Sequence, residues 1–272
     1  MKKGWEINPA GDGKVLHALS AGSKPFKMGM HKMVSNTAGS DVSVVVEPRI
    51  AVVGVGGAGC NVTSSIYSAL APVDTILINT DKKALDDLPA DRKIYICKAV
   101  TKGEGTKGDT RLGNRCAKVH EDEIEKALLG YDAVFIIAGL GGGTGTGAAS
   151  VVAEICDRSG LMTFVAAINP FCFESSRLSV AAEGLRSIRA VCPNTFVVDN
   201  DKILQLMPEA TMDEAMRAVN RSIMGFVLDT AKIMPDMVIE ETDSAVEKMK
   251  RRIERSVARD IPEAKTASWL KV

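Results

Sequence analysis

The chain has 272 residues, 46% of them apolar, which is enough to bury the core of one large α/β domain or two small ones. Its formal net charge is zero, with 34 basic and 34 acidic residues, so no global field would draw it to nucleic acid or to an anionic membrane. The six cysteines are scattered without a C-x-x-C pair, and only three histidines accompany them, so composition suggests neither a zinc site nor a disulfide framework.

The amino-terminal segment differs in character from the rest of the chain. Residues 1–46 are rich in Gly, Ser, Lys and Met and show no sustained helical or strand period, which predicts a mostly disordered, mildly basic extension. There are two other interpretations. The segment is a functional arm, or the start codon is assigned too early and the true start is Met30 or Met33. No export signal or run of membrane-spanning length is found, and we expect a cytoplasmic protein.

From Ile50 onward, short apolar runs alternate with segments of helical spacing. Continuous apolar runs are typical of parallel strands that are buried on both faces. They occupy residues 50–55, 75–79, 93–97, 133–138, 162–168 and 195–198, and helical spacing covers 59–70, 82–88, 111–129, 147–159 and 177–190. The alternation predicts an α/β fold, a doubly wound parallel (Rossmann-like) sheet with helices on both faces and ligands at the carboxyl ends of its strands.

The turn after the first predicted strand is glycine-rich. Residues 54–61 read Gly-Val-Gly-Gly-Ala-Gly-Cys-Asn. Glycines lack a Cβ, so backbone N–H groups can approach an anion closely, and the next helix offers its positive amino end. Turns of this kind also bind NAD or FAD, and some only pack a helix tightly. A nucleotide site is the favoured interpretation.

A second glycine-rich turn follows the fourth predicted strand. Residues 139–147 read Gly-Leu-Gly-Gly-Gly-Thr-Gly-Thr-Gly, with six glycines and two hydroxyls immediately before a helix. This is more anion-binding capacity than packing needs, and a flexible linker would not join a buried strand to a helix at this point. No lysine follows the glycines, so the motif is not a P-loop. The turn predicts phosphate binding.

The second turn resembles the signature of the tubulin and FtsZ superfamily, and the resemblance, closest to FtsZ-type proteins, runs from about residue 50 to residue 220. Residues 78–81 resemble the family's second phosphate loop, and residues 101–109 take the place of the loop that reaches the γ-phosphate. Lys107 and Asp109 depart from that loop's usual composition, and Lys107 either neutralises phosphate charge or points to solvent. The resemblance implies phosphate contacts from Gly56, Gly57, Ala58, Asn61, Thr106, Gly108, Gly141, Gly142, Gly143, Thr144 and Gly145.

The resemblance also implies the residues that meet the sugar and the base. Glu174 and Arg177 match the ribose-binding loop, although a pair at a helix start is the alternative. Asn200 matches the asparagine that contacts guanine. Residues 211–232 have the apolar spacing of a long central helix, on which Met216 would pack on the base and Asn220 accept from guanine.

The carboxyl-terminal part departs from the family. FtsZ catalyses hydrolysis with a loop that reads Asn-x-Asp-Phe-x-Asp, which residues 237–247 do not contain. Our catalytic candidates there are Asp243, Glu240 and Glu241, with Glu247 also able to substitute; alternatively, these acids only begin a helix whose later part is basic. The resemblance places the family's second domain in this part of the chain, and from the number of residues after Val246 we expect that domain to be missing.

These observations predict a domain order and a function. We expect a GTP-binding domain at residues 47–235, then a variant acidic loop, a short basic helix and a tail at 236–272. The resemblance implies a slow or partner-dependent GTPase that uses GTP and Mg²⁺, acts in cytoskeletal or cell-division-type assembly, and self-associates or co-assembles with a full-length FtsZ-like protein. A GTP sensor that does not hydrolyse its ligand is the alternative. An NAD-dependent oxidoreductase, with Asp81 holding a ribose, is disfavoured by the second glycine cluster.

Overall fold

The computed structural model describes residues 33–35, 44–46, 48–67 and 73–231. The chain divides into two compact units, and residues 49–227 belong to the first. The second unit includes the strands β1 (Met33–Ser35) and β2 (Val44–Val46), which pair antiparallel. Both strands lie in the segment predicted to be a disordered extension. Most of that segment is outside the described residues, so the prediction stays a prediction.

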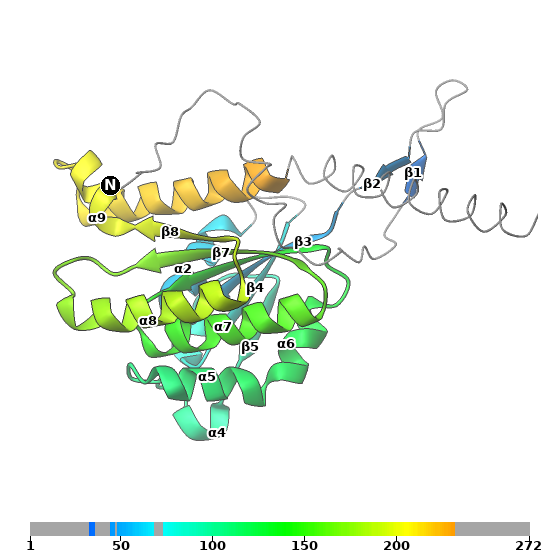
Figure 1. Ribbon diagram of the computed structural model, residues 1–272, viewed down its shortest axis with the longest axis horizontal. Helices are drawn as coiled ribbons and strands as arrows, with labels where there is room; N and C mark the ends of the chain where they lie inside the picture. Colours follow the sequence, from blue (N-terminus) through cyan, green and yellow to red (C-terminus); the bar gives the residue numbers. More distant parts are fainter. Residues whose placement is uncertain (1–32, 36–43, 47, 68–72, 232–272) are drawn as a thin grey trace, which may run out of the picture. The chain divides into compact units, whose positions relative to one another are not determined.

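A six-stranded sheet forms the centre of the first unit (Figure 1). All its strands are parallel, and their order is β5-β4-β3-β6-β7-β8. β3 is buried along its whole length, and most residues of β4, β6 and β7 are buried too, which is why these segments read as continuous apolar runs. The strands are β3 (Ile50–Val55), β4 (Val73–Asn79), β5 (Arg92–Tyr95), β6 (Ala133–Gly139), β7 (Met162–Asn169) and β8 (Thr195–Asp199).

Helices cover both faces of this sheet, which confirms the predicted fold (Figure 1). A large core cluster joins one face to the helices α5 to α8, and a smaller cluster around Cys60, Leu77 and Leu85 joins the other face to α2 and α3. The helices are α2 (Gly56–Ile66), α3 (Lys82–Asp86), α4 (Lys98–Thr101), α5 (Thr110–Val119), α6 (Glu121–Leu128), α7 (Gly143–Arg158), α8 (Ser175–Val191) and α9 (Asn200–Leu206).

A further helix occupies residues 212–231, where the sequence predicts one. Phe226 on this helix contacts three phenylalanines of the sheet, Phe135, Phe164 and Phe196, with ring centroids 6.0, 6.3 and 4.1 Å away. The helix is therefore held on the sheet by aromatic packing. Side chains alternate between the two faces along a strand, and Val134 and Ile136 belong to the larger cluster, so Phe135 and this helix lie on the other face, which is the α2 side. None of the described helices is long and apolar enough to cross a membrane.

The structure corrects the sequence interpretation in three places. The predicted helix at 111–129 is two helices that meet at His120, whose ring bonds back to the carbonyl of Cys116 at 3.0 Å. The helices α2 and α7 begin within the glycine-rich turns, because their first-turn glycines carry no apolar period. Cys97 and Cys116 form a disulfide, with Cα atoms 5.1 Å apart, although the spacing of the cysteines suggested none.

Candidate nucleotide-binding site

The amino ends of α2 and α7 meet at the carboxyl edge of the sheet. The strands β3 and β6 are neighbours; β3 leads directly into α2, and β6 leads into α7 through the turn at 140–142. Gly56 has a φ of +73°, and a Cβ on it would lie 2.5 Å from the backbone nitrogen of Gly145. The first turns of the two helices are thus in direct backbone contact. This is the topological switch point of the sheet, since the helices then run over opposite faces.

Neither of these helix starts is capped by a side chain. The N-cap residues are Val55 and Gly142, and the first turns of α2 and α7 contain no acidic residue. The first backbone N–H groups of a helix have no partner within the helix and carry its positive partial charge. Two such helix ends side by side form a place where an anion can accept hydrogen bonds from several backbone N–H groups.

The glycines at this edge divide into two kinds. A Cβ on Gly59 would lie 2.2 Å from the carbonyl oxygen of Ile137, and a Cβ on Gly145 would lie 2.3 Å from that of Gly139, so these glycines permit close packing. Gly57 and Gly142 have no heavy atom within 4 Å of a Cβ position. These two glycines therefore border open space at the helix starts, where an anion could be received.

Three threonine hydroxyls gather beneath the start of α7. The hydroxyl of Thr144 lies 2.6 Å from that of Thr80 and 3.3 Å from that of Thr106, and all three residues are buried. They come from the end of β4, the loop at 102–109 and α7. Thr106 and Thr144 are among the predicted phosphate contacts, and Thr80 lies within residues 78–81, which resemble the family's second phosphate loop.

The loop at 102–109 is held against this edge by its neighbours. The hydroxyl of Thr101 donates to the carbonyl of Thr80 at 3.1 Å, and the backbone nitrogen of Lys82 donates to that of Gly103 at 3.2 Å. A Cβ on Gly143 would lie 2.1 Å from the Thr106 hydroxyl. The loop therefore adjoins the first turn of α7.

The two residues that depart from the family loop have partners within the protein. Lys107 forms an exposed ion pair with Glu104 at 2.6 Å, and its hydrogen bond lowers the pKa of that carboxyl. Asp109 accepts from the backbone nitrogen of Leu112 at 2.9 Å and caps α5. Gly108 is exposed, with no heavy atom within 4 Å of a Cβ position. Lys107 thus lies in solvent in this structure.

The candidate ribose residues lie at the start of α8. Glu174 accepts from the backbone nitrogen of Phe171 at 3.1 Å and forms an ion pair with Arg177. A Cβ on Gly141, whose φ is +90°, would lie 2.7 Å from the Cβ of Arg177, so this helix start adjoins the second glycine turn. The pair therefore lies near the edge of the sheet where α2 and α7 begin, which we call the phosphate edge. Its two side chains are also bonded to each other, as the alternative of a simple helix-start pair predicts.

The candidate base residues lie on α9 and on the helix at 212–231. Asn200 begins α9 directly after β8, is 6% exposed, and its side-chain oxygen has no hydrogen-bond partner among the described residues. Met216 and Asn220 are half-buried and one turn apart, whereas Asn61 is exposed on α2. An unpartnered buried amide oxygen is costly and is suited to accept from a ligand. Asp243, Glu240 and Glu241 lie outside the described residues.

Two other observations bear on the chemistry of the described part of the chain. Asp81 accepts from the backbone nitrogen of Ala84 at 3.0 Å, so its carboxylate caps α3 rather than standing free for the ribose of a dinucleotide. In the part of the chain that the structure describes, no group of three or more His, Cys, Asp or Glu residues is arranged to hold a metal ion.

Comparison with known proteins finds a family that matches the part of the chain containing this edge. The model of the tubulin/FtsZ family, GTPase domain, matches residues 49–208. Cell division protein FtsZ 2 of Methanocaldococcus jannaschii is 38% identical over 178 residues, which are 65% of this chain and 47% of that protein. Cell division protein FtsZ 1 of Pyrococcus furiosus is 40% identical over 177 residues, or 64% of this chain and 48% of that protein. The chain spans about half the length of the curated relatives it matches.

Solved structures agree with the sequence relatives. An FtsZ dimer from M. jannaschii has a TM-score of 0.65 and 35% identity, covering 69% of this chain and 55% of that one. CetZ2 from Haloferax volcanii, solved as a GTPγS-bound protofilament, has a TM-score of 0.62 and 26% identity, covering 69% of this chain and 59% of that one.

Proposed function

We propose that this chain, which belongs to the tubulin/FtsZ family through a GTPase domain at residues 49–208, binds GTP on the paired amino ends of α2 and α7. The observation that carries the proposal is the contact of two uncapped helix starts beside the open space at Gly57 and Gly142. Backbone N–H groups there suit a polyanion and need no lysine. The proposed phosphate contacts are Gly56, Gly57, Ala58, Asn61, Thr106, Gly108, Gly141, Gly142, Gly143, Thr144 and Gly145.

The rest of the nucleotide extends toward α8, α9 and the helix at 212–231. Glu174 and Arg177 hold the ribose once their mutual ion pair opens, and Asn200 accepts from guanine through its unpartnered oxygen. Met216 packs on the base and Asn220 accepts a second hydrogen bond from it. An acceptor pair of this kind favours guanine, because adenine presents no donor at the equivalent ring position.

The same arrangement supports a proposal for hydrolysis. The N–H groups of the two helix starts stabilise charge that develops on the γ-phosphate as water attacks in line with the bond that breaks. Mg²⁺ held by the phosphates would supply further charge neutralisation there. Asp243, Glu240 or Glu241 orients the water, and because these residues depart from the family's acidic loop we propose a slow or partner-dependent reaction.

The relatives suggest the cellular role. Several are cell division proteins, and a structural neighbour was solved as a protofilament. We propose that this chain acts in the cytoplasm in cytoskeletal or cell-division-type assembly, by weak self-association or by co-assembly with a full-length FtsZ-like protein. Its GDP form is the product state of the same site.

Measurement of GTP turnover distinguishes the proposed GTPase from a GTP sensor that does not hydrolyse its ligand. The altered acidic sequence at 237–247 favours the sensor. With GTP and Mg²⁺, we expect phosphate release whose rate per molecule rises with protein concentration, accompanied by increased light scattering. Bound GTP without phosphate above the blank, alone or with a full-length homologue, would leave only the sensor. Exchange with labelled GTP, ATP and NAD in parallel tests which nucleotide the protein binds. Exchange with NAD alone would exclude both the GTPase and the GTP sensor.

The threonine cluster offers a test of the phosphate edge. Thr144→Val removes the hydroxyl that joins Thr80 and Thr106 while keeping nearly the same shape. We expect GTP binding to weaken about tenfold and the free energy of unfolding to fall by roughly 2 kcal/mol, because the hydroxyls of Thr80 and Thr106 each lose a partner. Titration with a fluorescent GTP analogue and chemical denaturation measure the two effects. The matched control is Thr163→Val, a buried threonine on β7 that loses one hydrogen bond of 3.0 Å to Leu161 and should bind GTP normally.

A further inference from the structure

The disulfide between Cys97 and Cys116 lies at the two ends of the loop that adjoins the start of α7. Cys97 precedes α4, and Cys116 lies within α5, with residues 102–109 between these helices. The backbone at Cys97 has a φ of 62°, so the chain turns sharply where the bridged segment begins. The two bridged cysteines are 19 positions apart in the sequence, and the whole loop at 102–109 lies between them.

The bridge anchors this loop to elements that touch the phosphate edge. On the Cys116 side, a Cβ on Gly113 would lie 2.3 Å from the carbonyl oxygen of Gly143, so α5 packs directly on the first turn of α7. On the Cys97 side, the carbonyl of Cys97 accepts from the backbone nitrogen and from the hydroxyl of Thr101, and that hydroxyl also reaches the carbonyl of Thr80. A constraint between the two sulfurs therefore acts on both supports of the loop.

We propose that Cys97 and Cys116 form a redox-modification site that sets the rate of nucleotide release, with the bridged form releasing nucleotide more slowly. The proposal rests on the proposed GTP site, because its effect is exerted through Thr106 and the loop at 102–109. Bridging two ends of a loop removes open conformations from its ensemble, and a nucleotide under that loop then leaves less often. Intracellular disulfides that are made and broken are typical of redox sensing.

The reaction is an exchange with a small dithiol. A thiolate of the dithiol attacks one sulfur of the bridge, and its second thiol resolves the mixed disulfide. The dithiol loses two electrons and two protons and becomes a cyclic disulfide, while Cys97 and Cys116 gain both and become thiols. The oxidised dithiol reverses the reaction. Cys116 is fully buried and Cys97 is 8% exposed, so Cys97 is the sulfur that a reagent meets first.

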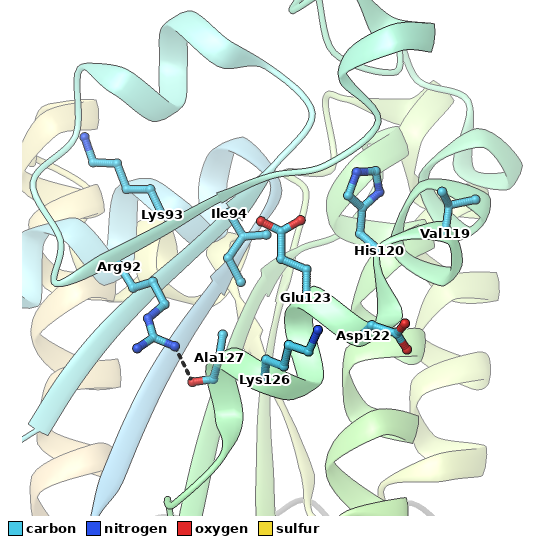
Figure 2. A pocket seen from close by; sticks show the side chains of 9 residues that line it. All are labelled: Arg92, Lys93, Ile94, Val119, His120, Asp122, Glu123, Lys126 and Ala127. Atoms are coloured by element: carbon cyan, nitrogen blue, oxygen red, sulfur yellow. Dashed lines mark hydrogen bonds between the residues drawn. The ribbon is translucent and has the colours of Figure 1, made fainter.

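A cavity of about 480 Å³ lies between β5 and α6, and His120 is one of the residues that line it (Figure 2). His120 lines it together with Arg92, Lys93 and Ile94 of β5 and residues of α6. A ring nitrogen of His120 is 3.0 Å from the carbonyl oxygen of Cys116 and 3.4 Å from the backbone nitrogen of Cys97. His120 thus contacts the backbone of both bridged residues and also lines this hollow, which is the approach that we propose for a small reagent.

The remaining described thiols are poorly suited to the same reaction. Burial raises the pKa of Cys60 and of Cys156 to about 12, so these thiols stay protonated at neutral pH. Cys172 is exposed, but its hydrogen bond with Asp201 raises the pKa of its thiol above the ordinary value. Cys192 is buried, and its thiol pKa is raised by desolvation. Oxidation by a mild disulfide reagent should therefore be selective for the Cys97–Cys116 pair.

The test compares the full chain after equilibration with reduced or with oxidised dithiothreitol. Trypsin cleavage at the exposed Lys102 and Lys107 should be slower in the oxidised protein. The fragments produced should remain joined on a non-reducing gel, because the bridge spans both cleavage sites. Release of a fluorescent GDP analogue, chased with unlabelled GDP, should be roughly fivefold slower in the oxidised protein.

Variants identify the bridge as the cause. The double variant Cys97→Ala/Cys116→Ala should release the analogue equally fast in both buffers, at the rate of the reduced protein, while Cys172→Ala should keep the fivefold response. Equal release from oxidised and reduced protein, with the joined fragments present, would overturn the proposal, as would failure of the fragments to join. Absence of nucleotide binding in both buffers would instead contradict the proposed function, and the trypsin rates would then decide whether the bridge restrains the loop.

Discussion

Replacing Gly142 with aspartate is expected to weaken GTP binding at least ~100-fold while leaving the fold slightly more stable. Gly142 is the N-cap of α7, with φ −95° and ψ 170°, an extended conformation that any residue adopts. No heavy atom lies within 4 Å of a Cβ at this position. An aspartate therefore fits without a clash and can accept from the N–H groups of the first turn.

The two effects have opposite signs because the carboxylate takes the place proposed for phosphate. An aspartate cap and its charge at a helix start are together worth about 0.5 kcal/mol in stability relative to glycine. The same charge close to a phosphate costs on the order of 4 kcal/mol at the effective dielectric constant of a protein surface. Thermal unfolding without nucleotide measures the first effect, and titration with a fluorescent GTP analogue measures the second.

Gly142→Asn is the matched control, since it also caps the helix but carries no charge. It should lose less than tenfold in GTP affinity, as a neutral side chain in the same space. Normal GTP affinity in the aspartate variant would show that phosphate does not bind at the start of α7, and the proposed function would be wrong. A destabilised aspartate variant would contradict the open space at Gly142.

Replacing Gly147 with alanine is expected to lower the free energy of unfolding by about 3 kcal/mol. A Cβ at Gly147 would lie 2.0 Å from the carbonyl oxygen of Thr110 and 2.8 Å from the backbone nitrogen of Asn114. Both atoms belong to the backbone of α5, which cannot move aside as the end of a flexible side chain can. The added methyl group would force α5 away from α7 and disturb the supports of the phosphate edge.

Gly225→Ala provides the control for this effect. Gly225 is also a helical glycine, on the helix at 212–231, and no heavy atom lies within 4 Å of its Cβ position. Alanine there should add about 0.5 to 1 kcal/mol of stability, because it reduces the entropy of the unfolded chain without strain. Chemical denaturation of both variants checks the pair. Equal stability of Gly147→Ala and the unchanged protein would mean that α5 and α7 do not pack this closely.

The six strands of the parallel sheet, the fold class and the two glycine-rich turns follow from the sequence by itself. The first strand is predicted and observed at the same residues, Ile50–Val55, because burial on both faces demands an unbroken apolar run that can be seen locally. The two clusters of glycine after β3 and β6 are likewise visible in the sequence, although only some of these glycines, such as Gly59 and Gly145, lie where a Cβ would collide with backbone. The family resemblance rests on the same segments, and comparison confirms it.

Only the tertiary structure decided which distant residues meet. Thr80 joins Thr144 across 64 positions of sequence, because β4 and β6 flank β3 in the sheet, an order that no local pattern records. Cys97 pairs with Cys116 because α5 folds back onto the segment before α4, which brings their Cα atoms to 5.1 Å, whereas their spacing in the sequence resembles that of unpaired cysteines. Apolar periodicity reports the burial of a segment, but contact between segments depends on strand order and helix packing.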